Sequence, residues 1–324
     1  MIRSYILSFA FVMLASFMNA QQDPQFTQWY MDPVTSNIAA AGQTNLTNIN
    51  VFYRQQWVGI DRRPVTSLLN FDTRFGEGPV GMGFQFYQDE IGNESNTMIK
   101  IGPSFTFNNN STGTKFSGGL SLSIFTKKIG DFYSWIPPDG EGSIGNDPAI
   151  PNGVETSNTI DLDFGLFMRN SNKYYAGISS THLLERSFKD FSITPSRHYY
   201  IMAGYNFSLS GDDLVLRTNF LTKTDLAATA VDVNINVLLN NMIWVGASYR
   251  PGDAVAPVLG YQLKMEKQDQ ISNSEQLLRI GYSYDVTTSE LQTYSNGSHE
   301  IFLSYGFVFK STPIQNKYAN PRFL

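Results

Sequence analysis

The chain has 324 residues, of which 42% are hydrophobic, 14% aromatic and 16% charged, a charged fraction well below the roughly 25% of typical soluble domains. Its 24 Phe, 17 Tyr and 26 Gly residues favour strands and turns over helices. The absence of cysteine excludes disulfides, cysteine-ligated zinc, iron–sulfur clusters and thiol nucleophiles. A formal net charge of −5 without a basic stripe argues against nucleic acid as a partner.

The first twenty residues have the pattern of an export signal. Arg3 supplies a positive charge, residues 5–18 form a short apolar run, and Ala20 precedes a polar stretch. The run is too short for a stop-transfer helix, and beyond it no stretch approaches the roughly 18 apolar residues of a spanning helix. We therefore expect a cleaved signal peptide at 1–20. Met18 is an imperfect residue three positions before the cut, and an N-terminal membrane anchor is the alternative.

The rest of the chain alternates between apolar and polar or small residues. In one segment, Ile160, Leu162 and Phe164 share a face opposite Asp161 and Asp163. Alternation with period two predicts β-strands with one apolar face, and the segments have the length of about ten residues typical of tilted membrane strands. About fourteen strands are predicted, at 49–58, 65–75, 79–88, 97–107, 114–127, 158–169, 173–181, 197–209, 213–221, 229–239, 241–249, 255–266, 276–285 and 299–310.

The connections between these segments alternate in length. After the first gap, every second connection is long, and those between are mostly tight turns, although 267–275 is longer than the pattern requires. This rhythm predicts an all-β chain that forms a single transmembrane antiparallel β-barrel over 49–310, with short periplasmic turns and longer extracellular loops. Two soluble β-sandwiches are the alternative, but they do not require a face rich in Phe, Leu and Tyr on every strand. The long connections are 89–96, 128–157, 182–196, 222–228 and 286–298.

Aromatic residues recur near the predicted strand ends. In membrane barrels such residues form girdles at the two lipid–water interfaces, while ordinary strand aromatics are the alternative for each one. The candidates for a girdle are Trp57, Phe75, Tyr87, Trp244, Tyr249 and Tyr284.

Patterns that support catalysis or metal binding are nearly absent. The three histidines, His182, His198 and His299, form no HExxH or HxH motif. The loop 139–147 is rich in acidic residues and glycine but lacks the spacing of an EF-hand, so a solvated loop is the better interpretation. We therefore expect no enzymatic activity, no cofactor and no metal site.

Several charged residues fall on the strand faces opposite the apolar side chains. An Arg or Lys on the lipid face costs about 2–4 kcal/mol near the midplane, so these charges are expected to face the lumen. A conducting pore with a selectivity ring and a salt-bridged lumen closed by a plug both fit this pattern, and the plug is favoured. The predicted lumen charge network comprises Arg54, Asp161, Asp163, Arg217, Asp232, Arg279 and Asp285.

Two tails flank the predicted barrel. Residues 21–48 carry aromatics and prolines that would be poorly placed in a free polar tail, so we predict an N-terminal periplasmic or plug segment. Residues 311–324 contain prolines that block regular pairing and are predicted to form a periplasmic C-terminal tail. The predicted partner-binding residues, from the N-terminal segment and from the loop 128–157, are Phe26, Trp29, Tyr30, Trp135, Asp139 and Asp147.

Several short motifs carry a family likeness. They are QDPQFTQWYMDP at 22–33, AG at 41–42, RQQW at 54–57, GYSYDV at 281–286, GSHEI at 297–301 and PRF at 321–323. Together they resemble the PorP/SprF family of type IX secretion and gliding proteins of Bacteroidota. One departure is Asn37-Ile38-Ala39, where the family usually has Asn-Pro-Ala, which leaves the turn geometry there open.

This resemblance implies an outer-membrane barrel of the type IX secretion system, surrounded by outer-membrane lipid and without catalytic residues. Some members work with the core apparatus and a periplasmic peptidoglycan-binding lipoprotein. Others serve one large surface adhesin with a type-B C-terminal domain, and this chain is expected to dock, export or retain such an adhesin. A porin or hydrophobic-substrate channel is the alternative, and a soluble exported binding module is a third possibility.

Overall fold

The computed structural model describes residues 23–308, except positions 45, 77, 110, 131–152, 171–172, 191–192 and 270–271. None of the helical segments in this part of the chain has the length and apolarity to cross a membrane. The elements are β1 Thr47–Gln55, β2 Val65–Arg74, β3 Val80–Ile91, β4 Glu94–Asn109, β5 Thr114–Ile129, β6 Glu155–Asn170, β7 Tyr174–Thr181, β8 His198–Ser210, β9 Leu214–Thr224, β10 Thr229–Leu239, β11 Ile243–Arg250, β12 Ala254–Asp269, β13 Ser272–Thr287 and β14 Ser298–Phe307, with the 3₁₀ helices η1 Trp29–Met31, η2 Pro33–Thr35, η3 Ile38–Ala40 and η6 Glu290–Thr293.

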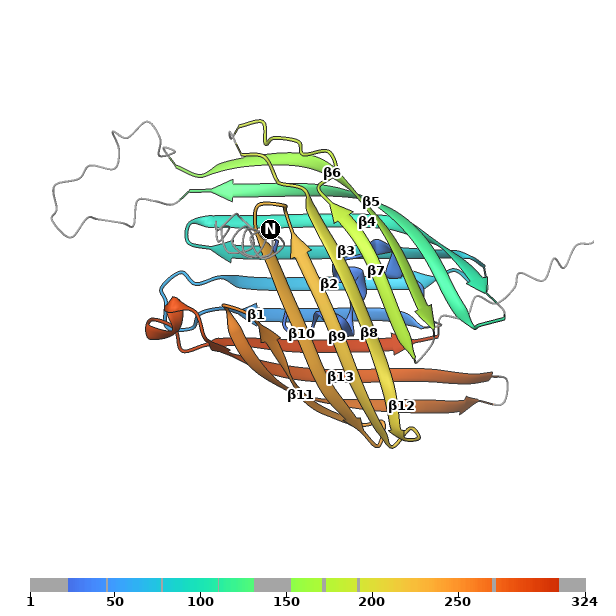
Figure 1. Cartoon of the computed structure of the whole chain (residues 1–324). Helices are drawn as coiled ribbons and strands as arrows, with labels where there is room; N and C mark the ends of the chain where they lie inside the picture. The colour runs from blue at the N-terminus through green and yellow to red at the C-terminus, as the bar shows by residue number, and fades with distance from the viewer. Residues whose placement is uncertain are drawn as a thin grey trace, which may run out of the picture.

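The strands form one closed antiparallel barrel (Figure 1). Each strand pairs with its neighbours in sequence, and β1 pairs with β14 to close the wall. Closure leaves no sheet edge, which is what a strand protein needs in lipid, because lipid supplies no hydrogen-bond partner for an unpaired backbone group. The predicted all-β barrel of about fourteen strands is therefore confirmed, and its architecture is that of an outer-membrane barrel.

The two ends of the barrel differ in their connections. The connections 56–64, 92–93, 182–197, 225–228, 251–253 and 288–297 all lie at one end of the barrel, with 56–64 and 288–297 on the left in Figure 1. We call this the long-loop end. The other end, here called the short-turn end, carries the connections 75–79, 110–113, 171–173, 211–213, 240–242 and 270–271.

Two predicted gaps are corrected by the structure. The expected long connection 89–96 is the two-residue turn 92–93, because β3 and β4 continue as a paired hairpin past the apolar segment. The expected gap 267–275 likewise shrinks to 270–271. The sequence pattern ends early because apolar side chains alternate only along the part of a strand that faces lipid. Backbone pairing of these hairpins continues beyond the lipid, where the side chains are polar. The predicted signal peptide 1–20 and tail 311–324 lie outside the described residues.

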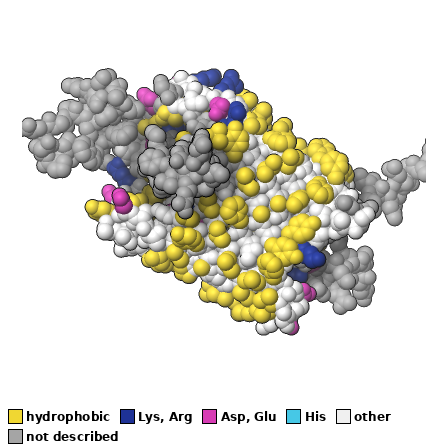
Figure 2. Space-filling model, in the orientation of Figure 1, with side chains coloured by type: hydrophobic (Ala, Val, Ile, Leu, Met, Phe, Trp, Pro, Cys, Tyr) yellow, Lys and Arg dark blue, Asp and Glu magenta, His cyan; other side chains and the backbone are white. Residues whose placement is uncertain are grey.

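Side chains alternate between the two faces of the wall as the sequence pattern predicts. In β5, Leu120, Leu122 and Ile124 are exposed on the outer surface, whereas Ser121 and Ser123 are buried inside. Figure 2 shows hydrophobic side chains spread over the outer wall between the two ends, with the charged side chains near the ends. This surface has the composition expected of a lipid-facing belt.

Two of the six girdle candidates face inward instead. Tyr87 and Trp244 are buried, and the indole of Trp244 lies so close to Gly260 that a Cβ there would be 2.0 Å from a ring carbon. Glycine on the neighbouring strand leaves the space that this large ring occupies inside the barrel. Phe75 and Tyr249 are exposed, as an interfacial position requires.

A first prediction concerns the lipid-facing wall. Leu122 lies near the middle of β5, with Ile101 and Leu162 opposite it on the two flanking strands. Replacing Leu122 with Arg should lower the free energy of unfolding by about 2–4 kcal/mol, because a cation is then placed in lipid. Urea unfolding in phospholipid vesicles measures this. The control is Leu226→Arg, in the exposed connection 225–228, and equal losses in the two variants would contradict the assignment of the outer face.

Candidate functional site

Residues 23–44, here called the N-terminal segment, run through the barrel interior from one end to the other (Figure 1, dark blue). At the long-loop end, Asp23 contacts Thr181, the last residue of β7. At the short-turn end, the amide of Gly42 donates to Asp72 Oδ2 at 3.0 Å. The chain then enters β1 directly, so the segment is continuous with the wall that encloses it.

Apolar side chains of the segment form a core with inward-facing residues of the wall. Phe26 packs against Phe52 of β1 with 5.0 Å between ring centroids, and Phe52 packs against Phe302 of β14 at 4.8 Å. Trp29 and Tyr30 are also buried in this core. A fourteen-stranded barrel is too wide for its own wall side chains to fill, and the segment fills much of the remaining space.

Glycines on the inner wall permit the close approach of η3. A Cβ on Gly119 would lie 2.7 Å from the amide nitrogen of Ala39, and one on Gly165 would lie 2.0 Å from Asn37 Oδ1. Larger residues at these two positions would displace the segment. The wall is therefore shaped to the segment rather than to an open channel.

Asn37 resolves the turn that the sequence left open. Its side chain caps η3 by accepting from the amide of Ala39 at 3.0 Å and donates to the carbonyl oxygens of Leu166 and Ile178 in the wall. Ile38 occupies the first helical position, where proline would also be suitable. Its side chain packs above Gly83, so Ile38 contacts the wall while Asn37 caps the turn.

A first polar cluster joins the segment to the seam between β1 and β14. Arg54 Nη2 lies 2.7 Å from Asp285 Oδ2, and Arg54 Nη1 lies 3.1 Å from Glu300 Oε2. The amides of Thr27 and Gln28 donate to the two oxygens of Glu300 at 2.7 and 2.8 Å. Buried charges are stable only when paired and hydrogen-bonded, and here the backbone of the segment supplies part of that pairing.

Arg250 extends this cluster on β11. Its Nη2 lies 3.1 Å from Asp232 Oδ2, and its Nη1 lies 2.6 Å from Asp253 Oδ2 and 3.4 Å from Asp285 Oδ2. We call Arg54, Arg250, Asp232, Asp285 and Glu300 the arginine cluster. Two guanidinium groups among three buried carboxylates form a connected network on one side of the lumen, close to the long-loop end.

A second cluster surrounds Asp23, at the start of the described chain. His182 Nε2 lies 3.3 Å from Asp23 Oδ1, and His182 Nδ1 lies 3.0 Å from Asp161 Oδ2. Tyr200 donates to Asp23 Oδ2 at 2.7 Å, and Lys223 Nζ donates to the Asp23 carbonyl oxygen at 2.5 Å. His198 lies beside them, with Nδ1 4.0 Å from Asp23 Oδ2.

The ionisation of this second cluster follows from its charges. Burial alone would raise the pKa of Asp23, but His182 and His198 outweigh burial and hold this pKa well below its usual range. Burial would likewise lower the pKa of His182, but the carboxylates of Asp23 and Asp161 raise it to about 10. At neutral pH the arrangement therefore favours a cation between the carboxylates.

A third group of polar contacts lies deeper along the segment. The buried Asp32 carboxylate accepts a hydrogen bond through Oδ2 from Asn70 Nδ2 at 2.7 Å. Arg279 donates to Ser304 Oγ at 2.8 and 3.2 Å and lies over the ring of Phe302. These contacts tie the middle of the segment and the neighbouring wall into the same polar interior.

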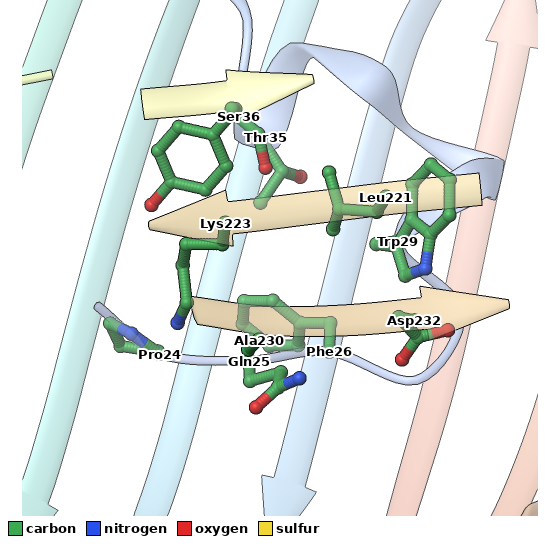
Figure 3. A pocket seen from close by; sticks show the side chains of 11 residues that line it. Pro24, Gln25, Phe26, Trp29, Thr35, Ser36, Leu221, Lys223, Ala230 and Asp232 are labelled. Atoms are coloured by element: carbon green, nitrogen blue, oxygen red, sulfur yellow. The ribbon is translucent and has the colours of Figure 1, made fainter. Parts of the chain in front are cut away.

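Two small cavities lie beside the segment. A cavity of about 20 Å³ lies between it and strands β9 and β10, where Trp29, Leu221 and Lys223 line it (Figure 3). A second cavity of about 50 Å³ adjoins Asp23 and His182. Each of these two volumes holds a few water molecules at most.

The structure places every predicted lumen charge on the inner side of the wall. Arg54, Asp232 and Asp285 meet in the arginine cluster, and Asp161 contacts His182. Asp163 pairs with Lys100 at 2.6 Å. The two remaining predicted residues lie apart from these clusters: Arg279 is bound to Ser304, and Arg217 lies on β9 opposite Asn206 and Asn236.

The predicted partner-binding residues fall into two groups. Phe26, Trp29 and Tyr30 are buried against the chain's own wall, so their role toward a partner stays a prediction. The other three, Trp135, Asp139 and Asp147, lie outside the described residues.

Sequence reasoning missed several residues of these clusters. Alternation along β11 and β14 could have placed Arg250 and Glu300 inside, beside the predicted charges. No local pattern could have joined His182, His198 and Asp23, because they come from the end of one strand, the start of the next and a segment far away in sequence.

Comparisons with known proteins agree with the sequence motifs. The family model described as type IX secretion system membrane protein PorP/SprF matches residues 18–305. No curated protein gives a significant match. Among solved structures, the toluene transporter TbuX of Ralstonia pickettii is similar with a TM-score of 0.49 and 10% identity, over 88% of this chain and 94% of that chain.

Two further solved structures are similar at comparable levels. The CymD monoaromatic hydrocarbon channel has a TM-score of 0.45 and 10% identity, over 91% of this chain and 95% of that chain. The outer membrane protein Omp33 of Acinetobacter baumannii has a TM-score of 0.42 and 9% identity, over 82% of this chain and 99% of that chain.

A second prediction follows from the arginine cluster. Replacing Arg54 with Met should lower the free energy of unfolding by about 3–5 kcal/mol, because the buried Glu300 loses its cation and Asp285 keeps only the longer contact with Arg250. Urea unfolding in vesicles checks this value. The matched control is Arg197→Met, since Arg197 pairs with Glu185 at the surface and an exposed pair contributes about 1 kcal/mol or less. A loss for Arg54→Met no larger than that of the control would show that the cluster does not stabilise the barrel.

Proposed function

We propose that this chain, which belongs to the PorP/SprF family of type IX secretion system membrane proteins, is a non-enzymatic docking barrel of the outer membrane. Its cargo is a large surface adhesin with a type-B C-terminal domain, which the barrel helps to export or retain. A periplasmic peptidoglycan-binding lipoprotein of the same secretion system is its proposed partner on the inner side.

The observation that supports docking over transport is the filled lumen. The N-terminal segment packs against the inner wall and supplies hydrogen bonds to buried charges such as Glu300. A passive porin needs a continuous aqueous path, and the two cavities described beside the segment are small. A barrel closed in this way offers its end surfaces to a protein partner.

The orientation of the barrel assigns a role to each end. Outer-membrane barrels keep short turns in the periplasm and longer loops outside, so the long-loop end is the proposed adhesin side. Asp23 then lies near the outer end and Gln43, bound to Thr106, near the periplasmic end. In this orientation the segment crosses the barrel as a plug, which is one of the two alternatives expected for residues 21–48.

The docking role is tested in cells. A strain lacking this protein should fail to display the adhesin on its surface, and the wild-type chain should restore display. Surface immunolabelling measures display, and mass spectrometry of the tagged barrel purified in mild detergent identifies the bound adhesin and periplasmic partner. Normal display in the deletion strain would refute the docking role.

The closed lumen is tested separately by conductance in planar bilayers. The wild-type barrel should conduct poorly, whereas Gly165→Leu should raise conductance, because a Cβ at this position already meets Asn37 Oδ1 at 2.0 Å and pushes the segment away. Gly118→Leu is the control, because position 118 faces outward and a Cβ there makes only an ordinary 3.5 Å contact with Leu166. High conductance of the wild type would favour the porin alternative instead.

A further inference from the structure

The cluster around Asp23 brings together three side chains that can act as metal ligands. One ring nitrogen each of His182 and His198 and one carboxylate oxygen of Asp23 lie within 4.8 Å of one another. His182 directly follows β7, His198 begins β8, and Asp23 belongs to the N-terminal segment. Two imidazoles and one carboxylate are a donor set that suits Zn²⁺ and related transition-metal ions.

The spacing of these groups is close to that of a coordination shell. Ligands about 2.0–2.1 Å from a tetrahedral zinc ion are separated from one another by about 3.3 Å. His182 Nε2 and Asp23 Oδ1 lie 3.3 Å apart. The imidazole of His198 adjoins this pair, with Nδ1 4.0 Å from Asp23 Oδ2, and one ligand atom of each of the three residues lies within 4.8 Å of the other two.

Second contacts orient both imidazoles. Nδ1 of His182 faces Asp161 Oδ2 at 3.0 Å, an arrangement in which a carboxylate holds the far side of a metal-binding histidine. Nδ1 of His198 donates to the carbonyl oxygen of Ser196 at 2.9 Å, because a carbonyl can only accept. In both rings the neutral form therefore keeps its lone pair on Nε2, the nitrogen free to bind a metal.

Two further features fit a bound ion. His198 is buried, and its Nε2 has no hydrogen-bond partner among the described residues, which is costly unless another group binds there. The cavity of about 50 Å³ adjoins Asp23 and His182. It is large enough for a water molecule, which could complete the shell as a fourth ligand.

The charges around the cluster also accommodate a cation. Asp23 and Asp161 lie in the cluster, and the Asp163 carboxylate lies beside it, where it accepts from the His182 amide and pairs with Lys100. Lys223 faces the backbone carbonyl of Asp23 rather than its carboxylate. When both imidazoles are neutral, the three carboxylates and the two lysines leave a net charge of about −1 around the cluster. A bound dication then supplies the same charge as protonation of the two imidazoles.

The backbone at His182 supports a positioned ligand rather than a chance contact. His182 adopts φ of 55°, in the left-handed region that residues other than glycine rarely occupy. Its amide donates to Asp163 Oδ1 at 3.2 Å, which holds this conformation. Strained conformations of this kind persist where the surroundings over-determine them, often at binding sites.

We propose that Asp23, His182 and His198 bind a divalent transition-metal ion of the Zn²⁺ class, which ties the N-terminal segment to β7 and β8. The proposal concerns how the lumen is closed and does not depend on the adhesin role. Ca²⁺ and Mg²⁺ are excluded as the preferred ions, because they favour all-oxygen ligand sets. The bound ion would cross-link the start of the segment to the wall at the long-loop end.

The test uses the full-length barrel, purified in detergent without a histidine tag and stripped of metal with EDTA. We expect about one Zn²⁺ per chain by elemental analysis after re-equilibration, with no displacement by excess Ca²⁺ or Mg²⁺. Zn²⁺ should also raise the thermal unfolding midpoint, since it binds only the folded chain. Co²⁺ bound in place of Zn²⁺ should show the visible absorption of a tetrahedral site.

Variants separate this site from adventitious binding. His198→Gln should weaken Zn²⁺ binding in calorimetry by at least about tenfold, and Asp161→Asn by about 10- to 100-fold, as loss of an orienting carboxylate does elsewhere. His299→Gln is the matched control, because His299 lies away from the cluster beside Tyr282, and it should bind as the wild type does.

Two results would overturn the proposal. One is a wild-type chain that takes up no Zn²⁺ at micromolar concentration, which would leave the cluster as an ion pair of a protonated His182 with its carboxylates. The other is equal weakening in the His198 and His299 variants, which would indicate surface binding. If a variant does not fold, as judged by its heat-modified mobility in gels, the stoichiometry and Co²⁺ spectrum of the wild type decide.

Discussion

The pairing of β1 with β14 is the contact on which the rest of this structure depends. It closes the wall, so that no strand edge meets lipid, where an unpaired amide or carbonyl has no partner. Arg54 and Glu300 lie directly opposite each other across this seam, and Glu300 also accepts from the amides of Thr27 and Gln28. The same seam therefore closes the barrel and holds the N-terminal segment inside it.

A lipid-facing exterior determines what the interior must contain. Polar and charged side chains are costly on the outer face, so they collect in the lumen, where each charge needs a partner. The wall supplies some partners, as Arg250 does for Asp232, and the segment supplies others through its backbone and through Asp23. Without the segment, the apolar side chains on the inner wall would lose their packing partners. The buried carboxylates would also lose some of their hydrogen-bond donors. The segment is thus an integral part of the folded barrel.

The same arrangement bears on function. The arginine cluster and His182 and His198 lie toward the long-loop end, where they bind the first residues of the segment to the wall. A closed and anchored interior suits a protein that binds partners at its ends, as proposed for this member of the PorP/SprF family. A channel would need the opposite design, a polar bore that stays free of its own chain.

The amino-acid sequence by itself determined the strands, their number of about fourteen and the face on which most strand residues lie, because lipid outside and water inside impose a period of two along every strand. It thereby placed Arg54, Asp161 and Asp285 inside. Only the tertiary structure decided which of them meet, that Tyr87 and Trp244 turn inward, and that β3 and β4 continue into water. The alternation of apolar and polar residues predicts which face of the wall a residue lies on, but not which residues of other strands it contacts. Contacts such as Asp23 with His182 join segments distant in sequence, and only closure of the wall around the segment brings them together.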